Sequence, residues 1–379
     1  MSKVVSACEV KNKRVLHIAS TYFPDSHGGV EEVIRQICLN TNSHGIESRV
    51  FTLSPNPFPI KIMVEGCDVF RAKKNFEIAS CRFSIEAITK YKELVDWADI
   101  IHYHFPWPFA DFLHLFCKVQ KKSIVTYHSD VVRQKNLNKL YTPVMHAFLK
   151  SVDKIVTTSL NYSQSSPVLK QYRDKVVVIP IGLDENSYPV PSKSEVDLVE
   201  SKTGNDFFLF VGMFRKYKGL NYLLQSAQEI SMKIVIAGKG PLEKELKQIV
   251  SKLGLLNVQF LGEVSEVEKV ALFKLCRAVV LPSHLRSEAF GVTLIEGAMY
   301  GKPLISTEIN TGTSYINLNG KTGIVVPPRD YISLRNAIIR ISSDLSLSKK
   351  MGHSSRLRYE ELFTGQIMGE KYLDLYNAL

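Results

Sequence analysis

Two carboxylates eight residues apart are the most informative chemical groups in this sequence. Glu288 stands in a run of small residues with Gly291 shortly after it, and Glu296 stands in an apolar run typical of a helix. On one continuous helix the two acids would share a face, about 12 Å apart. With Glu288 in a loop, the pair can instead bracket a long ligand such as a nucleotide sugar, because a helix N-terminus suits a phosphate. An ordinary amphipathic helix with one solvated acid at its cap is the alternative.

A group of cations follows the predicted strand 207–211. Gly212 ends the strand, and Arg215, Lys216 and Lys218 come next. A strand, a glycine turn and cations at the start of a helix are typical of a diphosphate site. A surface turn with solvated cations is the alternative.

A pair of glycines, Gly28 and Gly29, stands between the first predicted strand and a helix. Two glycines let the backbone approach a phosphate or a sugar closely, and the amides of a helix N-terminus are then available to it. The pattern therefore indicates a ligand-binding loop, with a plain strand-to-helix turn as the alternative.

Histidines end two neighbouring predicted strands. His102 and His104 end one strand, and His128 ends the next. Neutral imidazole can donate a hydrogen bond to a sugar hydroxyl or accept one from it. Three histidines could also hold a metal, but no cluster of acidic ligands accompanies them, and we expect no metal site. A core histidine is the alternative for His102.

The order of these residues resembles the signature of retaining glycosyltransferases of family 4, two-domain enzymes of the GT-B fold. The likeness extends from Ser283 through Ser287-Glu288-Ala289-Phe290-Gly291 and Leu294-Ile295-Glu296-Gly297-Ala298 to Gly301-Lys302-Pro303. The resemblance implies that Glu288 faces the donor sugar and that Glu296 holds the ribose hydroxyls. It places His128 near the anomeric carbon, and it adds Phe290, Gly291 and Val292 to the donor site.

The resemblance continues in the loops of the second half. Lys218-Gly219 matches the family pattern, but Met213 stands where the family has an arginine, and we expect Arg215 to supply that cation from a shifted position. Glu263 aligns with the strand end that commonly contacts the base. In the loop 310–313, Asn310 replaces a glycine, and the turn should survive because asparagine tolerates a positive φ.

Short β-branched runs alternate with helical patterns along both halves of the chain. Continuous apolar runs separated by helices indicate parallel sheets covered on both faces. We therefore predict an α/β protein of the GT-B fold, with two Rossmann-like doubly wound domains facing across a cleft. The predicted strands include 15–18, 49–53, 99–102, 123–126, 154–157, 176–179, 207–211, 233–236, 258–261, 278–281, 303–306 and 323–326.

A Pro-, Ser- and charge-rich stretch with little periodicity separates the two sets of strands. We expect residues 1–185 to form an N-terminal acceptor-side domain, 186–206 a linker and 207–358 a C-terminal domain that binds the nucleotide-sugar donor. The resemblance implies that a C-terminal helix, residues 359–379, returns to the first domain.

The composition is that of a globular protein with a basic excess. Of 379 residues, 45% are hydrophobic and 22% charged, with a net charge of +11. The six scattered cysteines fit reduced thiols, and neither a signal peptide nor an apolar stretch of about 20 residues is evident. We expect a cytoplasmic protein.

Much of the excess charge is local, because residues 118–150 hold seven Lys and Arg against one acid, Asp130. With no nucleic-acid motif present, this region favours peripheral contact with an anionic membrane surface on the inner face of the cell membrane, where a polyprenyl-diphosphate acceptor would lie. A solvated basic face with no partner is the alternative.

Together these features predict a retaining glycosyltransferase that moves a hexose from a nucleotide sugar to a polyprenyl-diphosphate-linked saccharide during O-antigen or capsule synthesis. Likeness to polysaccharide mannosyltransferases favours GDP-mannose as the donor. Lysine and loop amides at the diphosphate would make a metal cofactor unnecessary. The alternatives are a UDP-hexose-dependent transferase, a nucleotide-sugar epimerase of the same fold, or a nucleotide-binding protein without catalysis.

Overall fold

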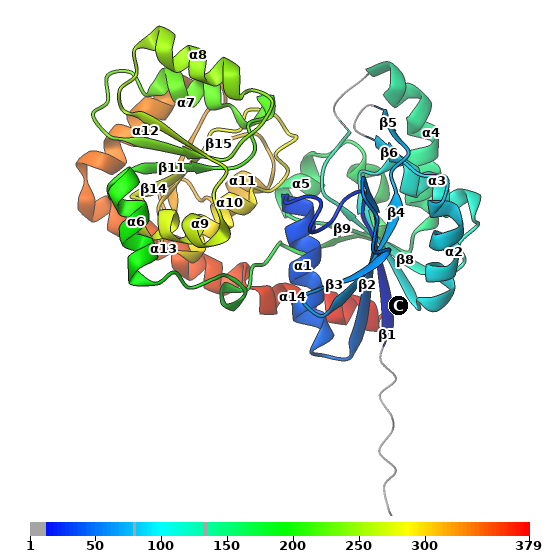
Figure 1. The fold of residues 1–379 in the computed structure, drawn as a ribbon. Helices are drawn as coiled ribbons and strands as arrows, with labels where there is room; N and C mark the ends of the chain where they lie inside the picture. The colour runs from blue at the N-terminus through cyan, green and yellow to red at the C-terminus, as the bar shows by residue number, and fades with distance from the viewer. Residues whose placement is uncertain (1–12, 79–80, 132–134) are drawn as a thin grey trace, which may run out of the picture. The chain divides into compact units, whose positions relative to one another are not determined.

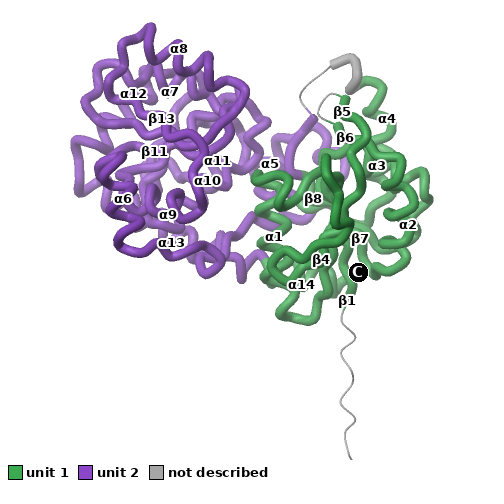
Figure 2. The backbone as a smooth tube through the Cα atoms, in the orientation of Figure 1, with its two compact units in different colours: residues 1–127, 133–156, 369–379 green, residues 128–132, 157–368 purple. Residues whose placement is uncertain are grey.

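The computed structural model describes residues 13–78, 81–131 and 135–379, with only the backbone over 135–138. The chain divides into two compact units (Figure 2). Unit 1 comprises Met1–Tyr127, Arg133–Val156 and Gly369–Leu379, and unit 2 comprises His128–Val132 and Thr157–Met368. Each unit is described by itself below.

In the described residues, the first sheet has eight strands in the order β10-β9-β8-β7-β1-β2-β4-β3. The pairings of β1 with β2 and β7, of β2 with β4 and of β7 with β8 are parallel, and β3 pairs antiparallel with β4. A separate hairpin is formed by β5 and β6. The bounds are β1 (Lys13–Ile18), β2 (Ile46–Ser54), β3 (Lys61–Val64), β4 (Cys67–Lys73), β5 (Phe76–Ile78), β6 (Cys81–Phe83), β7 (Ile100–Phe105), β8 (Lys122–Tyr127), β9 (Lys154–Thr157) and β10 (Val176–Val178).

The second sheet lies in unit 2 and runs in the order β13-β12-β11-β14-β15-β16, with every pair parallel. Helices α7 and α8 lie on one side of it and α9 and α10 on the other (Figure 1). The strand order reverses beside β11, which is where doubly wound sheets bind ligands. The bounds are β11 (Phe208–Val211), β12 (Ile234–Ala237), β13 (Val258–Gly262), β14 (Ala278–Leu281), β15 (Leu304–Thr307) and β16 (Gly323–Val326).

Helices connect the strands of both units. They are α1 (Gly29–Asn42), α2 (Ala87–Trp97), α3 (Pro108–Phe116), α4 (Lys135–Ser151), α5 (Leu160–Ser165), α6 (Lys193–Thr203), α7 (Leu220–Ser226), α8 (Glu243–Leu253), α9 (Glu266–Leu275), α10 (Val292–Met299), α11 (Gly312–Ile316), α12 (Tyr331–Ser343), α13 (Leu345–Leu362) and α14 (Gly365–Asn377). Short 3₁₀ turns are η1 (Leu169–Lys175), η2 (Glu185–Ser187) and η3 (Lys216–Lys218).

Helix α10, which carries Glu296, is pressed directly onto the second sheet. A Cβ atom at Gly297 would lie 2.8 Å from Val279 Cγ2 of β14 and 3.0 Å from Leu304 Cδ2 of β15. Apart from Val292, every residue of the helix is buried. The close approach that Gly297 permits therefore fixes the height at which the preceding residue, Glu296, stands above the sheet.

The predicted α/β architecture with parallel sheets is confirmed, and each predicted strand named above overlaps an observed one. Strands β3 to β6 were not predicted. The stretch 186–206, expected as a linker, contains helix α6, which a capping box between Ser192 and Glu195 begins. The tail expected as one helix is broken near residue 363 into α13 and α14.

Helix α14 packs on the sheet of unit 1. Tyr376 hydrogen-bonds His102 of β7 (2.8 Å), and Tyr372 hydrogen-bonds Thr126 of β8 (2.9 Å). All four of these side chains are buried. The last eleven residues of the chain therefore belong to the same compact unit as the first strands.

Candidate active site

Glu288 lies in the loop between β14 and α10, as the sequence predicted, and its carboxylate is buried beside a lysine. Lys218 Nζ lies 2.5 Å from Glu288 Oε2, and Ser283 Oγ donates a hydrogen bond of 3.0 Å to the same oxygen. Burial has the largest single effect and lowers the pKa of Lys218, but Glu288, Tyr217 and Glu296 together raise it by more, so the net shift is upward. Lys218 therefore stays cationic beside an acid that is 7% exposed.

Glu296 stands on α10 and forms a second buried acid–lysine pair. Lys269 Nζ of α9 lies 2.8 Å from Glu296 Oε1, and the Tyr188 hydroxyl donates to the same oxygen at 3.3 Å. Lys269 also pairs with Glu266 at 2.7 Å. Burial lowers the pKa of Lys269, yet the two carboxylates raise it well above its usual value. Sequence reasoning named Glu296 but missed Lys269 and Tyr188.

The loop that carries Glu288 is held by the loop that follows β15. The Gly312 amide donates to the Ala289 carbonyl at 2.8 Å, and a Cβ at Gly312 would lie 2.2 Å from Phe290 Cδ2. Asn310 adopts φ 55°, so the turn expected there survives the replacement of glycine. The Phe290 side chain is buried in this packing and against Phe363. Any contact of Phe290 with a donor would therefore come from its backbone.

Gly291 and Val292 begin α10. Gly291 is the residue before the helix, with φ 98°, and Val292 is the first helical residue. This conformation favours glycine, because a side chain there is strained. Helix α10 therefore begins between the two acids, so that Glu288 stands in the loop and Glu296 on the helix.

The other predicted cations of this unit lie in the turn after β11. Arg215 is exposed, and its Nε lies 3.0 Å from the sulfur of Met213. The side chain of Arg215 is thus beside the position where the resemblance expects an arginine. Glu263 follows β13 and forms an exposed ion pair with Lys239.

The predicted residues of unit 1 lie at the start of α1. Gly28 precedes the helix and Gly29 is its first residue. A Cβ at Gly28 would lie 2.6 Å from Glu31 Oε2. Glu31 is itself buried and accepts a hydrogen bond from Thr21, so the glycine leaves room for a carboxylate that sequence reasoning did not consider.

His128 falls in unit 2 and is 9% exposed. Burial lowers the pKa of its imidazole to about 4. The ring is therefore neutral at physiological pH and can exchange hydrogen bonds with hydroxyl groups in either direction.

A group of three metal-capable side chains occurs in the described part of unit 1: His17, His102 and His104. His17 Nδ1 and His104 Nε2 lie 3.1 Å apart, and both ring nitrogens of His102 are engaged, with Tyr376 and with Thr126. Ligation of a metal by His102 would require it to give up one of these hydrogen bonds. The network instead joins strands β1, β7 and β8 to helix α14.

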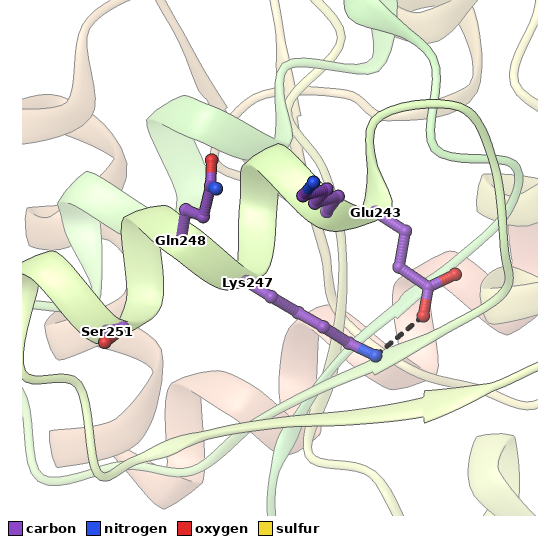
Figure 3. A pocket seen from close by; sticks show the side chains of 5 residues that line it. Glu243, Lys247, Gln248 and Ser251 are labelled. Carbon is purple, nitrogen blue, oxygen red and sulfur yellow. Dashed lines mark ion pairs between the residues drawn. The ribbon is translucent and has the colours of Figure 1, made fainter.

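A shallow hollow lies elsewhere, on the outer face of α8. It is lined by one helix only, including Glu243 and Lys247, which form an ion pair of 2.8 Å (Figure 3). None of the predicted site residues lines it.

Among the helices of the described residues, none combines the length and the apolar character that spanning a membrane requires.

The fold places the protein among the GT-B structures. Sucrose-phosphate synthase from Thermosynechococcus elongatus matches with a TM-score of 0.79 at 20% identity, over 97% of this chain and 98% of that one. The Anabaena HepE protein in complex with UDP-glucose matches with a TM-score of 0.78 at 18% identity, over 97% and 100%. Two α/β units built on largely parallel sheets, together with these structural matches, define a protein of the GT-B class.

Sequence comparisons identify the family within that class. Residues 27–187 match the model of Glycosyltransferase Family 4, and residues 194–358 match Glycosyl transferases group 1. The D-rhamnosyltransferase WbpZ of Pseudomonas aeruginosa is 48% identical over 93% of this chain and 92% of its own. The O-antigen chain mannosyltransferase C of Escherichia coli is 47% identical over 97% and 98%. The chain belongs to glycosyltransferase family 4 and is a retaining glycosyltransferase of the GT-B fold.

Proposed function

We propose that this glycosyltransferase moves a mannose-type sugar from a GDP-linked donor to a lipid-linked saccharide during surface-polysaccharide synthesis. The observation that carries the proposal is the ion pair of Lys218 and the buried Glu288, in which one group has the charge to bind a diphosphate and the other can accept hydrogen bonds from a sugar. The two relatives that are nearly half identical to this chain are named for the transfer of mannose and of D-rhamnose. D-Rhamnose is 6-deoxy-D-mannose, so both sugars share one ring configuration.

In the proposed complex, different residues contact the diphosphate, the sugar and the ribose of the donor. Lys218 has three N–H donors and so can keep Glu288 while it binds the diphosphate, with Arg215 and the amides at Gly291 and Val292 beside it. Both contacts of Glu288 described above go to Oε2, and we assign Oε1 to the donor sugar. Both contacts of Glu296 described above go to Oε1, and we assign Oε2 to hydrogen bonds with the ribose hydroxyls.

The reaction breaks the bond between the anomeric carbon and the diphosphate. Lys218 stabilises the negative charge that develops on the leaving group, and a charge held in place before the reaction is the effective kind. The acceptor hydroxyl enters on the leaving-group face, and the departing phosphate takes its proton. His128, neutral and buried, supports the sugar as positive charge develops at the anomeric carbon.

We assign the acceptor to unit 1, together with contact between this unit and the membrane surface. Phe112 and Phe116 of α3 are about half exposed, with their rings stacked 5.4 Å apart, and Leu140 of α4 is 78% exposed. Exposed aromatic side chains near cations suit the boundary between lipid and water. The cations are those of residues 118–150, of which Lys139 is exposed and Lys135 has a side chain outside the described residues.

A donor panel tests the proposed function. The protein is heated with GDP, UDP, GDP-mannose and UDP-glucose, with and without EDTA, as wild type and as Glu296→Ala. We expect a rise in Tm with GDP and GDP-mannose that is lost in Glu296→Ala. Glu243→Ala on the outer face of α8 is the control and should keep the shift. A shift with UDP compounds alone would overturn the choice of donor, and a shift that EDTA abolishes would overturn the metal-free site.

A transfer assay then separates the classes of enzyme. GDP-mannose is supplied with and without a polyprenyl-diphosphate-linked saccharide of the kind used in surface-polysaccharide synthesis. Mannose that reaches the lipid supports the proposal, whereas equal release of GDP without acceptor indicates hydrolysis of the donor and contradicts it.

Binding to vesicles tests the membrane contact. Neutralising Lys135 and Lys139 should weaken binding to anionic liposomes at low salt, because each cation near the surface contributes about 1 kcal/mol. Unchanged binding would contradict the membrane assignment without affecting the donor site.

A further inference from the structure

Arg286 is a partly buried side chain with several polar contacts, and the functional assignments above do not use it. It stands two residues before Glu288, and its side chain is 29% exposed. Nη1 donates to Ser165 Oγ at 3.0 Å and to the Asn310 carbonyl at 2.7 Å, and Nη2 donates to Asp130 Oδ2 at 3.3 Å. The guanidinium lies 5.0 Å from the centre of the Tyr162 ring. One side chain thus joins four segments of unit 2.

Asp130 is itself firmly held. Its Oδ1 accepts a hydrogen bond of 2.6 Å from Ser166 Oγ, and its backbone N–H donates to the Tyr162 hydroxyl at 2.6 Å. The Asp130 side chain is 14% exposed. The segment that contains Asp130 begins with His128, to which the proposed mechanism gives the support of the reacting sugar. Asp130 therefore offers Arg286 a fixed anchor only two residues from a catalytic candidate.

The loop after β15 completes the junction. Ser165 Oγ also donates to the Asn310 carbonyl, at 2.7 Å. Asn310 adopts a positive φ, and its backbone N–H donates a hydrogen bond of 2.8 Å to Glu308 Oε1. Two residues further on, the Gly312 amide bonds the Ala289 carbonyl. The contacts of Arg286 therefore hold the Glu288 loop on the N-terminal side of the acid, and the hydrogen bond from Gly312 holds it on the C-terminal side.

We propose that Arg286 is a positioning residue for the transfer reaction. Through Asp130 and the Asn310 carbonyl it sets the Glu288 loop in register with the segment that carries His128. A bidentate-capable guanidinium suits this task, because its planar donors fix direction as well as distance. The inference rests on the proposed function, since it takes Glu288 and His128 as the groups that meet the sugar.

The role predicts a separation between nucleotide binding and catalysis. GDP lacks the mannosyl group that is transferred, and its assigned contacts are Lys218 and Glu296, so Arg286→Ala should bind GDP within about threefold of wild type. The kcat for mannosyl transfer should fall by about 100-fold, which is the effect of misplacing a reacting group by about 1 Å. The gain in affinity that the mannosyl group adds to GDP should shrink as well, because Glu288 is assigned to that group.

The experiment compares Arg286→Ala, Arg286→Lys, Asp130→Asn and the Arg286→Ala/Asp130→Asn double variant with a matched control, Arg335→Ala. Arg335 lies in the same unit, pairs with Glu229 at 2.6 Å, contacts the Gln225 carbonyl and lies 5.8 Å from the Tyr331 ring. Like Arg286 it has an ion pair, a contact with a backbone carbonyl and a nearby tyrosine ring, but it lies outside the proposed site. The measurements are Tm, GDP and GDP-mannose affinities, kcat and KM.

Wild-type transfer is measured first, so that failure of the proposed function is seen separately. If wild type transfers, we expect kcat to fall in Arg286→Ala and in Asp130→Asn, with no further loss in the double variant because the two residues act as one unit. Arg286→Lys should recover part of the rate. Arg335→Ala should lose stability only. Equal kcat in Arg286→Ala and Arg335→Ala would overturn the inference, as would a parallel loss of GDP binding and kcat.

Discussion

The two acids of the site have nearly the same immediate surroundings but stand on different kinds of structure. Each gives one oxygen to a partly buried lysine and to one hydroxyl group, Lys218 and Ser283 for Glu288, and Lys269 and Tyr188 for Glu296. Each lysine also lies within 5.4 Å of the centre of a tyrosine ring.

The difference lies in the backbone that carries each pair. Glu288 and Lys218 both stand in connections that follow strands, whereas Glu296 and Lys269 project from helices α10 and α9. Residues on helices are held more firmly than residues on loops. The helix pair suits the unchanging nucleoside end of a donor. The loop pair suits the end where bonds change and charge moves.

The largest expected effect is on stability, and it tests whether the two lysines are equivalent. Lys218→Met and Lys269→Met each leave a buried carboxylate without its cation, which costs about 3–5 kcal/mol in the free energy of unfolding. Denaturant unfolding of the two variants measures it. The double variants Lys218→Met/Glu288→Gln and Lys269→Met/Glu296→Gln should recover most of the loss. Recovery of stability in only one of the two double variants would show that the two acid–lysine pairs are not equivalent.

Catalysis should separate the two acids. Glu288→Gln removes the charged acceptor that faces the sugar, and we expect kcat to fall by about 10²–10³-fold, the range found when one stabilising group is deleted from an active site. Glu296→Gln should change kcat much less, because its ligand does not react. Steady-state kinetics with GDP-mannose decides the point. A similar fall in kcat for both variants would contradict the division of roles.

Nucleotide affinity should give the reverse order. Glu296→Ala removes a charged acceptor for ribose hydroxyls, worth about 1.5–3 kcal/mol, so the Kd for GDP should rise by roughly 10- to 150-fold. A 2′-deoxyribose nucleotide has fewer hydroxyls to lose and should be affected less. Calorimetric titration of both nucleotides measures the difference. Glu288→Gln is the matched control and should keep the preference for ribose.

The same comparison shows which residues of the candidate site could be predicted from the sequence. Lys218 and Glu288 were predicted because each stands in a short motif next to a strand. Lys269 was not, because along the sequence it appears to be an ordinary helix partner of Glu266, three residues earlier. Its contact with Glu296 is 27 residues away and depends on the packing of α9 and α10, which no local pattern specifies.

The fold followed a similar rule. Buried parallel strands such as β11 and β14 are continuous apolar runs and were predicted. Strand β4 was missed because Asp68 and Arg71 interrupt its apolar residues, yet Arg71 is 5% exposed and donates to the Pro59 carbonyl. Such a buried cation is satisfied by a backbone partner that the sequence does not identify.

The smallest expected effect concerns pH and His128, which we assign to the reacting end with Glu288. The pKa of His128 is lowered from 6.5 to about 4. Between these values the unfolded chain binds a proton that the folded chain does not, so stability falls as pH is lowered from 6.5 to 4. His128→Asn should flatten this slope by up to about 1.4 kcal/mol per pH unit.

His114 gives the control for this last prediction. Burial also lowers its pKa to about 4, but it hydrogen-bonds Tyr103 and Ser151 in unit 1. His114→Asn should flatten the slope of stability with pH to a similar extent and leave kcat unchanged, whereas His128→Asn should change both. Unfolding measured from pH 4 to 8, with kcat at pH 7.5, distinguishes the two histidines. If both variants keep full activity, His128 is a core histidine and the reacting end depends on Glu288 and Lys218 without it.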